Sequence, residues 1–135
     1  EQQQKVVSLT AYKVLSIELA AGLGHTFYDN ETDYETVYFD QEIQHDFASW
    51  VSGDSMEPLY PNGSVALMKQ TGFDYDGAVY ALIWNGKTYI KKVYREAEGL
   101  RLESINPDYD DLFAPYEDEP KIVGIVVGHF LPLEV

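Results

Sequence analysis

The chain has 135 residues, 45% of them hydrophobic, which suits one globular domain with a single hydrophobic core. Its 23 acidic side chains outnumber 9 lysines and arginines, which gives a net charge of -14. This balance excludes DNA binding by this segment alone, because phosphate recognition rests on Lys and Arg. The sequence contains no cysteine, which excludes thiol catalysis, thiolate metal sites and disulfides and favours a reducing, cytoplasmic compartment.

The N-terminal part indicates a linker followed by an extended segment. Residues 1–4 are polar and lack an initiating Met, so we expect the chain to be cut from a longer protein at a linker. Residues 5–19 have the β-branched and aromatic content of an extended segment. Their interspersed polar side chains exclude a signal peptide or a membrane span. The small-residue bond Ala21-Gly22 follows, and residues 22–35 have the composition of a mobile loop.

From residue 36 onward the pattern is one of short strands separated by turns. Strands are predicted over residues 37–43, 47–51, 64–69, 78–84, 87–95, 100–105 and 122–131. Asn85-Gly86 supplies the two positive-φ positions of a type I′ hairpin turn. An acidic, proline-containing loop is expected over 106–120. The predicted class is therefore mostly β, with at most one short helix after Ser55.

Two local motifs together indicate a hydrolase without a catalytic histidine. Ser55 lies in the turn Gly53-Asp54-Ser55-Met56-Glu57-Pro58, and a lysine pair, Lys91-Lys92, lies in an apolar strand. A serine hydroxyl needs a base, and a lysine can supply one if burial lowers its pKa from about 10.4 towards 7. Strand alternation puts Lys91 and Lys92 on opposite faces, so one must face inward, and alternation leaves open which one.

Each motif alone has an ordinary structural explanation. Gly-Asp-Ser is common turn chemistry, and a lysine pair often guards a solvated sheet edge. An Ala-Gly pair is a common feature of flexible loops. The acidic loop has no EF-hand spacing, and the three histidines lack partners at the spacing of a catalytic triad, so neither predicts a metal site or a Ser-His-Asp site. What favours chemistry is the combination of the two motifs.

Residues 51–58, the Pro61-Asn62-Gly63 turn and residues 89–93 together resemble the S24 peptidase domain. This is the self-cleaving C-terminal domain of LexA and phage CI-type repressors, also found in the UmuD polymerase accessory proteins. The resemblance implies a LexA/signal-peptidase-like β fold of short strands and hairpins. It also implies that Ser55 is the nucleophile and Lys91 the general base. Lys92 stands where LexA proteins commonly have an arginine.

The resemblance further implies the cleavage bond and the oxyanion donors. Ala21-Gly22 matches the Ala-Gly self-cleavage site of the family. The backbone N–H groups of Asp54 and Ser55 would hold the oxyanion, a role that contributes about 3–4 kcal/mol per donor. The chain then divides into an upstream linker segment (1–21), a cleavage-site loop (22–35) and a peptidase and dimerisation domain (36–135).

The expected function is the autoproteolysis and dimerisation domain of a LexA/CI-like repressor. The family implies a homodimer, stimulation by RecA filaments on single-stranded DNA, and no metal or cofactor. Operator DNA would bind only through an N-terminal domain that this chain lacks, and no membrane partner is expected. Three alternatives stay open: a UmuD-like accessory subunit of a translesion polymerase, a signal-peptidase-like enzyme acting in trans, and a catalytically dead dimerisation module.

Overall fold

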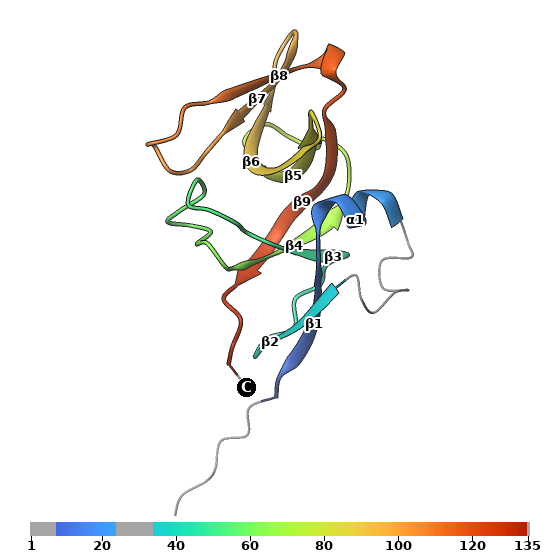
Figure 1. The fold of residues 1–135 in the computed structure, drawn as a ribbon, viewed down its shortest axis with the longest axis vertical. Helices are drawn as coiled ribbons and strands as arrows, with labels where there is room; N and C mark the ends of the chain where they lie inside the picture. The colour runs from blue at the N-terminus through green and yellow to red at the C-terminus, as the bar shows by residue number, and fades with distance from the viewer. Residues whose placement is uncertain (1–7, 24–33, 135) are drawn as a thin grey trace, which may run out of the picture.

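The computed structural model describes residues 8–23 and 34–134, and strands dominate this part of the chain (Figure 1). In chain order, the elements are β1 (Thr10–Leu15), α1 (Ile17–Leu23), β2 (Tyr34–Phe39), β3 (Phe47–Trp50), β4 (Val65–Gln70), β5 (Val79–Trp84), β6 (Lys87–Arg95), β7 (Gly99–Glu103), β8 (Leu112–Pro115), the 3₁₀ helix η3 (Tyr116–Asp118) and β9 (Lys121–Phe130). The predicted mostly β class is confirmed.

The described strands form one 9-stranded mixed sheet of order β2-β1-β3-β4-β9-β5-β6-β7-β8. β1 and β3 are parallel through the pair Val14–Ala48, whereas the other described neighbours are antiparallel. Figure 1 shows β9 running along the molecule, with β1 and β2 towards one end and β7 and β8 towards the other. Register shifts where β9 meets β4 and β5 bend the sheet, as β-bulges do.

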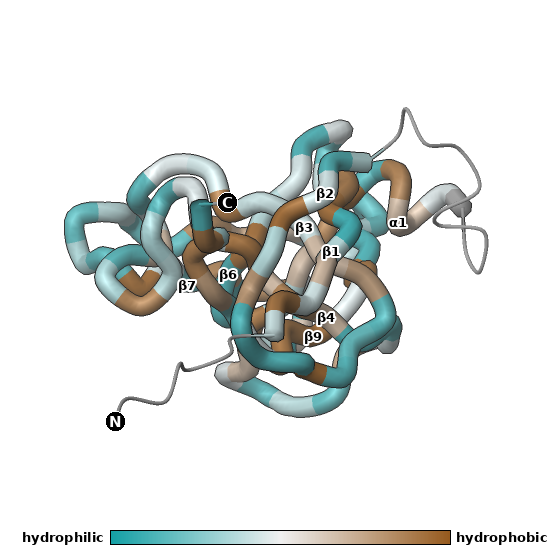
Figure 2. The backbone as a smooth tube through the Cα atoms, turned by 90° about the horizontal axis from the view of Figure 1, so that it is seen from below, coloured by the Kyte–Doolittle hydropathy of each residue, from teal (hydrophilic) through white to brown (hydrophobic). Residues whose placement is uncertain are grey.

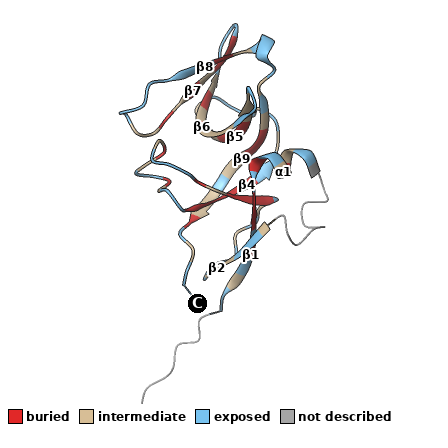
Figure 3. Ribbon diagram, viewed as in Figure 1, coloured by how far each residue is buried: buried red, intermediate tan, exposed pale blue. Residues whose placement is uncertain are grey.

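The core lies on both faces of the central strands. In β4, Val65 and Leu67 pack with Phe130 on one face, whereas Met68 packs with Met56 on the other. This two-sided burial explains why β4 has a continuous apolar run instead of an alternating one. Figure 2 shows hydrophobic stretches near β4, β9 and β6, and Figure 3 shows the buried segments along the same central strands. Met56 matters for the site, because it directly follows Ser55 and its side chain is anchored in this core.

The hairpin prediction is confirmed. β5 and β6 pair from Val79–Lys92 to Trp84–Lys87. Asn85 and Gly86 between them have φ of 51° and 74°, the left-handed values that a type I′ turn needs.

The acidic segment 106–120 is not only the loop that its composition predicts. Its residues 112–115 form β8, which pairs with β7 at the edge of the sheet. Leu112 and Phe113 are exposed there. Because this strand is short and presents apolar side chains outward, its pattern lacks the usual alternation of a half-buried strand.

The α-helix of the described residues lies upstream of Ser55, and the short helix downstream of it is the 3₁₀ helix η3. Between Ser55 and β4 the chain forms only turns, with a single i to i−4 bond from Tyr60 N to Met56 O at 2.9 Å. Pro61 follows directly and has no N–H to extend that turn into a helix. The α-helix of the described residues is α1, which precedes β2.

Candidate active site

Ser55 lies in a long turn between β3 and β4 whose base is closed by backbone hydrogen bonds. Val51 N donates to Ser64 O at 2.9 Å, and Gly63 N donates to Val51 O at 2.8 Å. Gly53 has a φ of 81°, which glycine adopts without the steric cost of a Cβ. Met56 is 1% exposed and anchors the turn in the core, so the neighbouring Ser55 is held at the rim of that core.

Lys91 is the lysine that faces inward. It lies in β6 and is 8% exposed, and its Nζ is 2.9 Å from Ser55 Oγ. The Lys92 side chain is 35% exposed and forms an ion pair with Glu103 at 3.5 Å. The choice that strand alternation left open is therefore settled geometrically, since Lys91 alone of the pair contacts Ser55 among the described residues.

The two lysines also differ in the direction of their pKa shifts. Burial lowers the pKa of Lys91, because desolvation disfavours the ammonium form. Tyr94 and Glu103 beside Lys92 raise its pKa. A lysine that loses its proton more easily is the better candidate for a base at neutral pH.

Ser104 is a site residue that the sequence motifs did not indicate. Lys91 Nζ donates to Ser104 Oγ at 2.7 Å, and Ser104 is 8% exposed. The pairing of Lys92 with Glu103 across β6 and β7 brings the next residue, Ser104, beside Lys91. Strand alternation carries a signal for this position, because Ser104 follows the inward-facing Leu100 and Leu102 at intervals of two.

The backbone amides of Asp54 and Ser55 are available as donors. Neither amide donates a hydrogen bond to any residue in the part of the chain that the structure describes. Their carbonyl groups are occupied instead: Asp54 O accepts from Glu57 N at 3.1 Å, and Ser55 O accepts from Asn106 N at 2.9 Å. Free N–H groups next to a serine hydroxyl are the donors that an oxyanion needs.

A cavity of about 140 Å³ opens beside Ser55 and Lys91. Its other walls combine the side chains of Ile17, Trp50, Val51, Met56, Tyr89 and Ile90 with the polar residues Ser52 and Thr88. A cavity of this size suits a small side chain next to a reacting carbonyl. In the part of the chain that the structure describes, no group of three acidic or histidine side chains could hold a metal ion.

The Ala21-Gly22 bond lies in α1 and is not docked on Ser55. Ser16 caps this helix, since Leu19 N donates to Ser16 Oγ at 3.1 Å, and Ala20 is fully buried beneath it. The carbonyl oxygen of Ala21 lies 3.5 Å from Lys121 Nζ on β9. Figure 1 shows α1 extending away from the segment between β3 and β4.

Residues 22 and 23, the start of the loop expected over 22–35, are therefore helical. They end the helix α1, whose first backbone N–H groups are capped by Ser16. Most of that loop, residues 24–33, lies outside the described residues. The structure thus brings Ser55, Lys91 and the two amides together, and leaves Ala21-Gly22 apart from them.

Comparison with known proteins identifies the family. A model of the Peptidase S24-like family matches residues 13–127, so the chain belongs to this family, and the resemblance seen in its motifs is confirmed.

No helix in the described ranges 8–23 and 34–134 is long and apolar enough to cross a membrane.

Curated relatives of the chain are bacterial and phage repressors. It is 42% identical over 77 residues to the repressor protein CI of Enterobacteria phage phi80, which covers 56% of the chain and 32% of that repressor. It is 30% identical over 118 residues to the LexA repressor of Lacticaseibacillus casei, which covers 84% of the chain and 55% of that repressor. The matched region thus spans about a third to just over half the length of these relatives.

Proposed function

We propose that this chain is the autoproteolysis and dimerisation domain of a LexA/CI-like repressor, and that Ser55 and Lys91 cut its own Ala21-Gly22 bond. The observation that carries the proposal is the distance of 2.9 Å between Lys91 Nζ and Ser55 Oγ, at a lysine that is only 8% exposed. Membership of the Peptidase S24-like family and similarity to LexA and CI repressors support it independently.

The proposed reaction begins with neutral Lys91. As Ser55 Oγ attacks the Ala21 carbonyl carbon, Lys91 Nζ takes the hydroxyl proton, and the amides of Asp54 and Ser55 receive the oxyanion. Lys91 then gives that proton to the nitrogen of Gly22 as the C–N bond breaks, which leaves an ester between Ala21 and Ser55. A water molecule deprotonated by Lys91 hydrolyses the ester and restores the serine.

Cleavage requires α1 to leave its observed place. The Ala21 carbonyl must exchange its contact with Lys121 for the cavity at Ser55, and the helix must unwind for an extended backbone to enter. Because both partners belong to one chain, the effective concentration of the bond is high once it is extended. An activator that binds the docked arrangement more tightly would shift the population towards it, and we assign this role to RecA filaments on single-stranded DNA.

The consequence for a repressor follows from linkage of domains. A dimer holds two DNA-binding domains together, so their joint affinity for an operator depends on an unbroken connection. The net charge of -14 is consistent with DNA binding by a separate domain. Cutting at Ala21-Gly22 would release those domains and end repression.

The test is intact mass of the purified chain after incubation at pH 7 and near pH 10. We expect cleavage between Ala21 and Gly22 that is faster at high pH, absent in Ser55→Ala and Lys91→Ala, and retained in the matched control Lys92→Ala. RecA filaments should accelerate cutting at pH 7. Cutting by Lys91→Ala at the rate of the unmodified chain would refute the assignment of the base. Cutting of a separately added Ser55→Ala chain, which cannot cut itself, would favour an enzyme that acts in trans.

A further inference from the structure

The Asp54-Ser55 end of the catalytic turn has fewer internal hydrogen bonds than the base of the turn. Residues 51–64 form no strand or helix, and Asp54 and Ser55 lie at the surface end of this turn. Within it, Gly53 N donates to Asn62 Oδ1 at 2.7 Å, and Glu57 N donates to Asp54 O at 3.1 Å. A nucleophile must be held within about 0.5 Å of its productive position, so such a turn needs support from outside.

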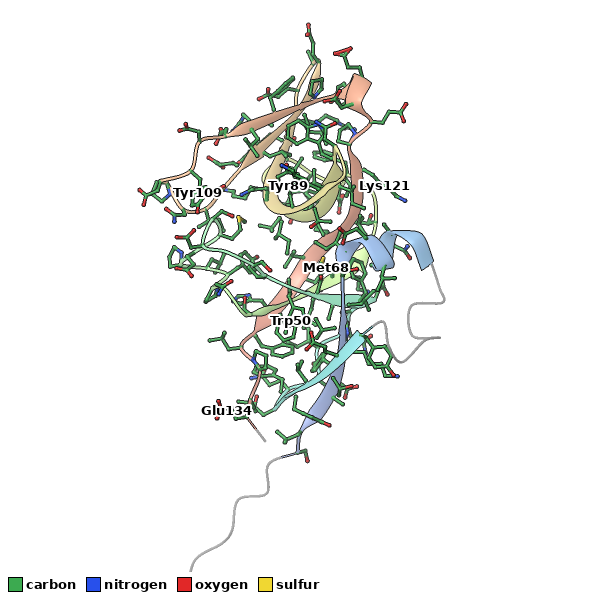
Figure 4. All side chains as sticks on the ribbon, in the orientation of Figure 1. Trp50, Met68, Tyr89, Tyr109, Lys121 and Glu134 are labelled. Carbon is green, nitrogen blue, oxygen red and sulfur yellow. The ribbon has the colours of Figure 1, made fainter. Side chains whose placement is uncertain are left out.

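That support comes from the loop that follows β7. Asn106 N donates to Ser55 O at 2.9 Å, Asn106 Nδ2 donates to Asp54 O at 3.1 Å, and the Tyr109 hydroxyl donates to Asp54 Oδ1. Asn106 and Asp54 are 52 positions apart in the chain. Figure 4 shows Tyr109 on the side of the molecule where the segment between β3 and β4 lies, with Lys121 on the opposite side.

We propose that Asn106 and Tyr109 form a clamp that positions the catalytic turn, so that the Ser55 amide points at the oxyanion and Lys91 stays shielded from water. This proposal rests on the function proposed above and adds two positioning residues to it. Asn106 acts through the geometry of the peptide bond between Asp54 and Ser55. In a planar trans peptide, the Asp54 carbonyl and the Ser55 N–H point in opposite directions, so fixing one fixes the other.

The Asn106 side chain has an unambiguous orientation. Its Oδ1 accepts from Asp108 N at 2.9 Å, while its Nδ2 donates to the Asp54 carbonyl. A carbonyl partner requires the NH₂ group and an N–H partner requires the oxygen, so the two contacts exclude a flipped amide. Tyr109 N also donates to Asn106 O at 3.2 Å. Asn106 therefore makes hydrogen bonds within its own loop and also joins this loop to the catalytic turn.

Tyr109 links the turn to the base. Its ring centroid lies 5.8 Å from Lys91 Nζ, and its hydroxyl is held by the Asp54 carboxylate. That hydrogen bond raises the pKa of Tyr109, which favours the neutral phenol beside Lys91. The carboxylates that act on the Tyr109 hydroxyl are those of Asp54, Asp108 and Glu57, whereas burial is the cause of the lowered pKa of Lys91. Removing the ring would expose Lys91 to water.

The experiment compares Asn106→Asp, Tyr109→Phe and Tyr109→Ala in self-cleavage from pH 6 to pH 11. Asn106→Asp keeps the acceptor for Asp108 N but loses the donor to Asp54 O, so we expect cleavage about 10- to 100-fold slower. Tyr109→Phe should be several-fold slower with an unchanged pH midpoint. Tyr109→Ala should also move the midpoint to higher pH. The control is Tyr116→Phe, which removes another exposed tyrosine hydroxyl, bonded to Glu96 O at 2.7 Å away from the site.

The clamp has a second readout that does not need cleavage. In the Ser55→Ala chain, the further change Asn106→Asp should shift the NMR signals of the backbone amides of residues 54 and 55. The further change Tyr109→Ala should raise the titration midpoint of Lys91. A chain that never cuts while these shifts occur would refute the proposed function and support the clamp. Folded Asn106→Asp and Tyr109→Phe variants that cut at the unmodified rate would overturn the clamp, as would unchanged NMR signals.

Discussion

Replacement of Ser104 by alanine isolates the positioning of the proposed base. Ser104→Ala removes an acceptor that lies 2.7 Å from Lys91 Nζ, where both residues are 8% exposed. A hydrogen bond to a charged group contributes about 1.5–3 kcal/mol, which corresponds to a factor of about 10–160 in rate if the bond is made in the transition state. We therefore expect self-cleavage at high pH, where Lys91 is neutral, to slow by about that factor.

The same change has a characteristic effect on pH dependence. The ammonium form of Lys91 loses more than the neutral amine when an acceptor is removed, so the pKa of Lys91 should fall further. The midpoint of the pH–rate profile should then move to lower pH while the plateau at high pH drops. A general loss of packing would lower the plateau without moving the midpoint.

The assay is the first-order rate of appearance of the fragment that begins at Gly22, followed by intact mass from pH 6 to pH 11. Ser49→Ala is the matched control, because Ser49 is a buried serine on β3, 3% exposed, whereas the described hydrogen bonds of Lys91 Nζ go to Ser55 and Ser104. Rates for Ser104→Ala within twofold of the unmodified chain at all pH values would refute the reasoning.

Three further predictions test other parts of the account. A Cβ at Gly22 meets no heavy atom within 4 Å, so Gly22→Phe should fold normally. Its self-cleavage, measured by mass, should be at least about 100-fold slower. Cleavage at the normal rate would contradict the proposed docking of the Ala21-Gly22 bond. Lys121→Met frees the Ala21 carbonyl and should speed cutting by up to about fivefold, because exposed contacts of lysine contribute at most about 1 kcal/mol; slower cutting would contradict this. Lys91→Met should raise the free energy of unfolding at pH 7, measured with urea, because it removes a desolvated ammonium.

The pH dependence of that last effect follows from linkage. The pKa of Lys91 is lower in the folded than in the unfolded chain, so the unfolded chain binds more protons between those two values. The contribution of Lys91 to the free energy of unfolding therefore rises with pH across that window, up to the ordinary lysine pKa of about 10.4. The gain in the free energy of unfolding that Lys91→Met produces should therefore shrink as the pH rises. A gain that grows with pH would contradict this direction of the pKa shift.

The two residues of the proposed dyad were predictable because each stands in a local motif. Ser55 follows a positive-φ glycine in a turn, and Lys91 lies in a strand fixed by the Asn85-Gly86 turn. Alternation could not separate Lys91 from Lys92, because the inward face of β6 depends on how the sheet bends. Only the packed structure brings Ser55 to the face that Lys91 presents.

The supporting residues and the resting place of the cleavage bond depend on long-range contacts. Asn106 and Tyr109 lie in a segment whose composition predicts a solvated loop, and nothing local indicates that they reach Asp54. The helix α1 is stabilised by burial of Ala20, although its Ala-Gly sequence is typical of a loop. Tertiary packing overrides weak local preference in such short segments.

The most direct test of the central claim is the titration of the Lys91 side chain by NMR in Ser55→Ala, which cannot cut itself. Lys92, whose pKa is raised by its neighbours, serves as the control within the same spectrum. We predict that Lys91 loses its proton below the ordinary lysine value of about 10.4, and before Lys92 does. A midpoint for Lys91 at or above that value would contradict its role as the base for Ser55.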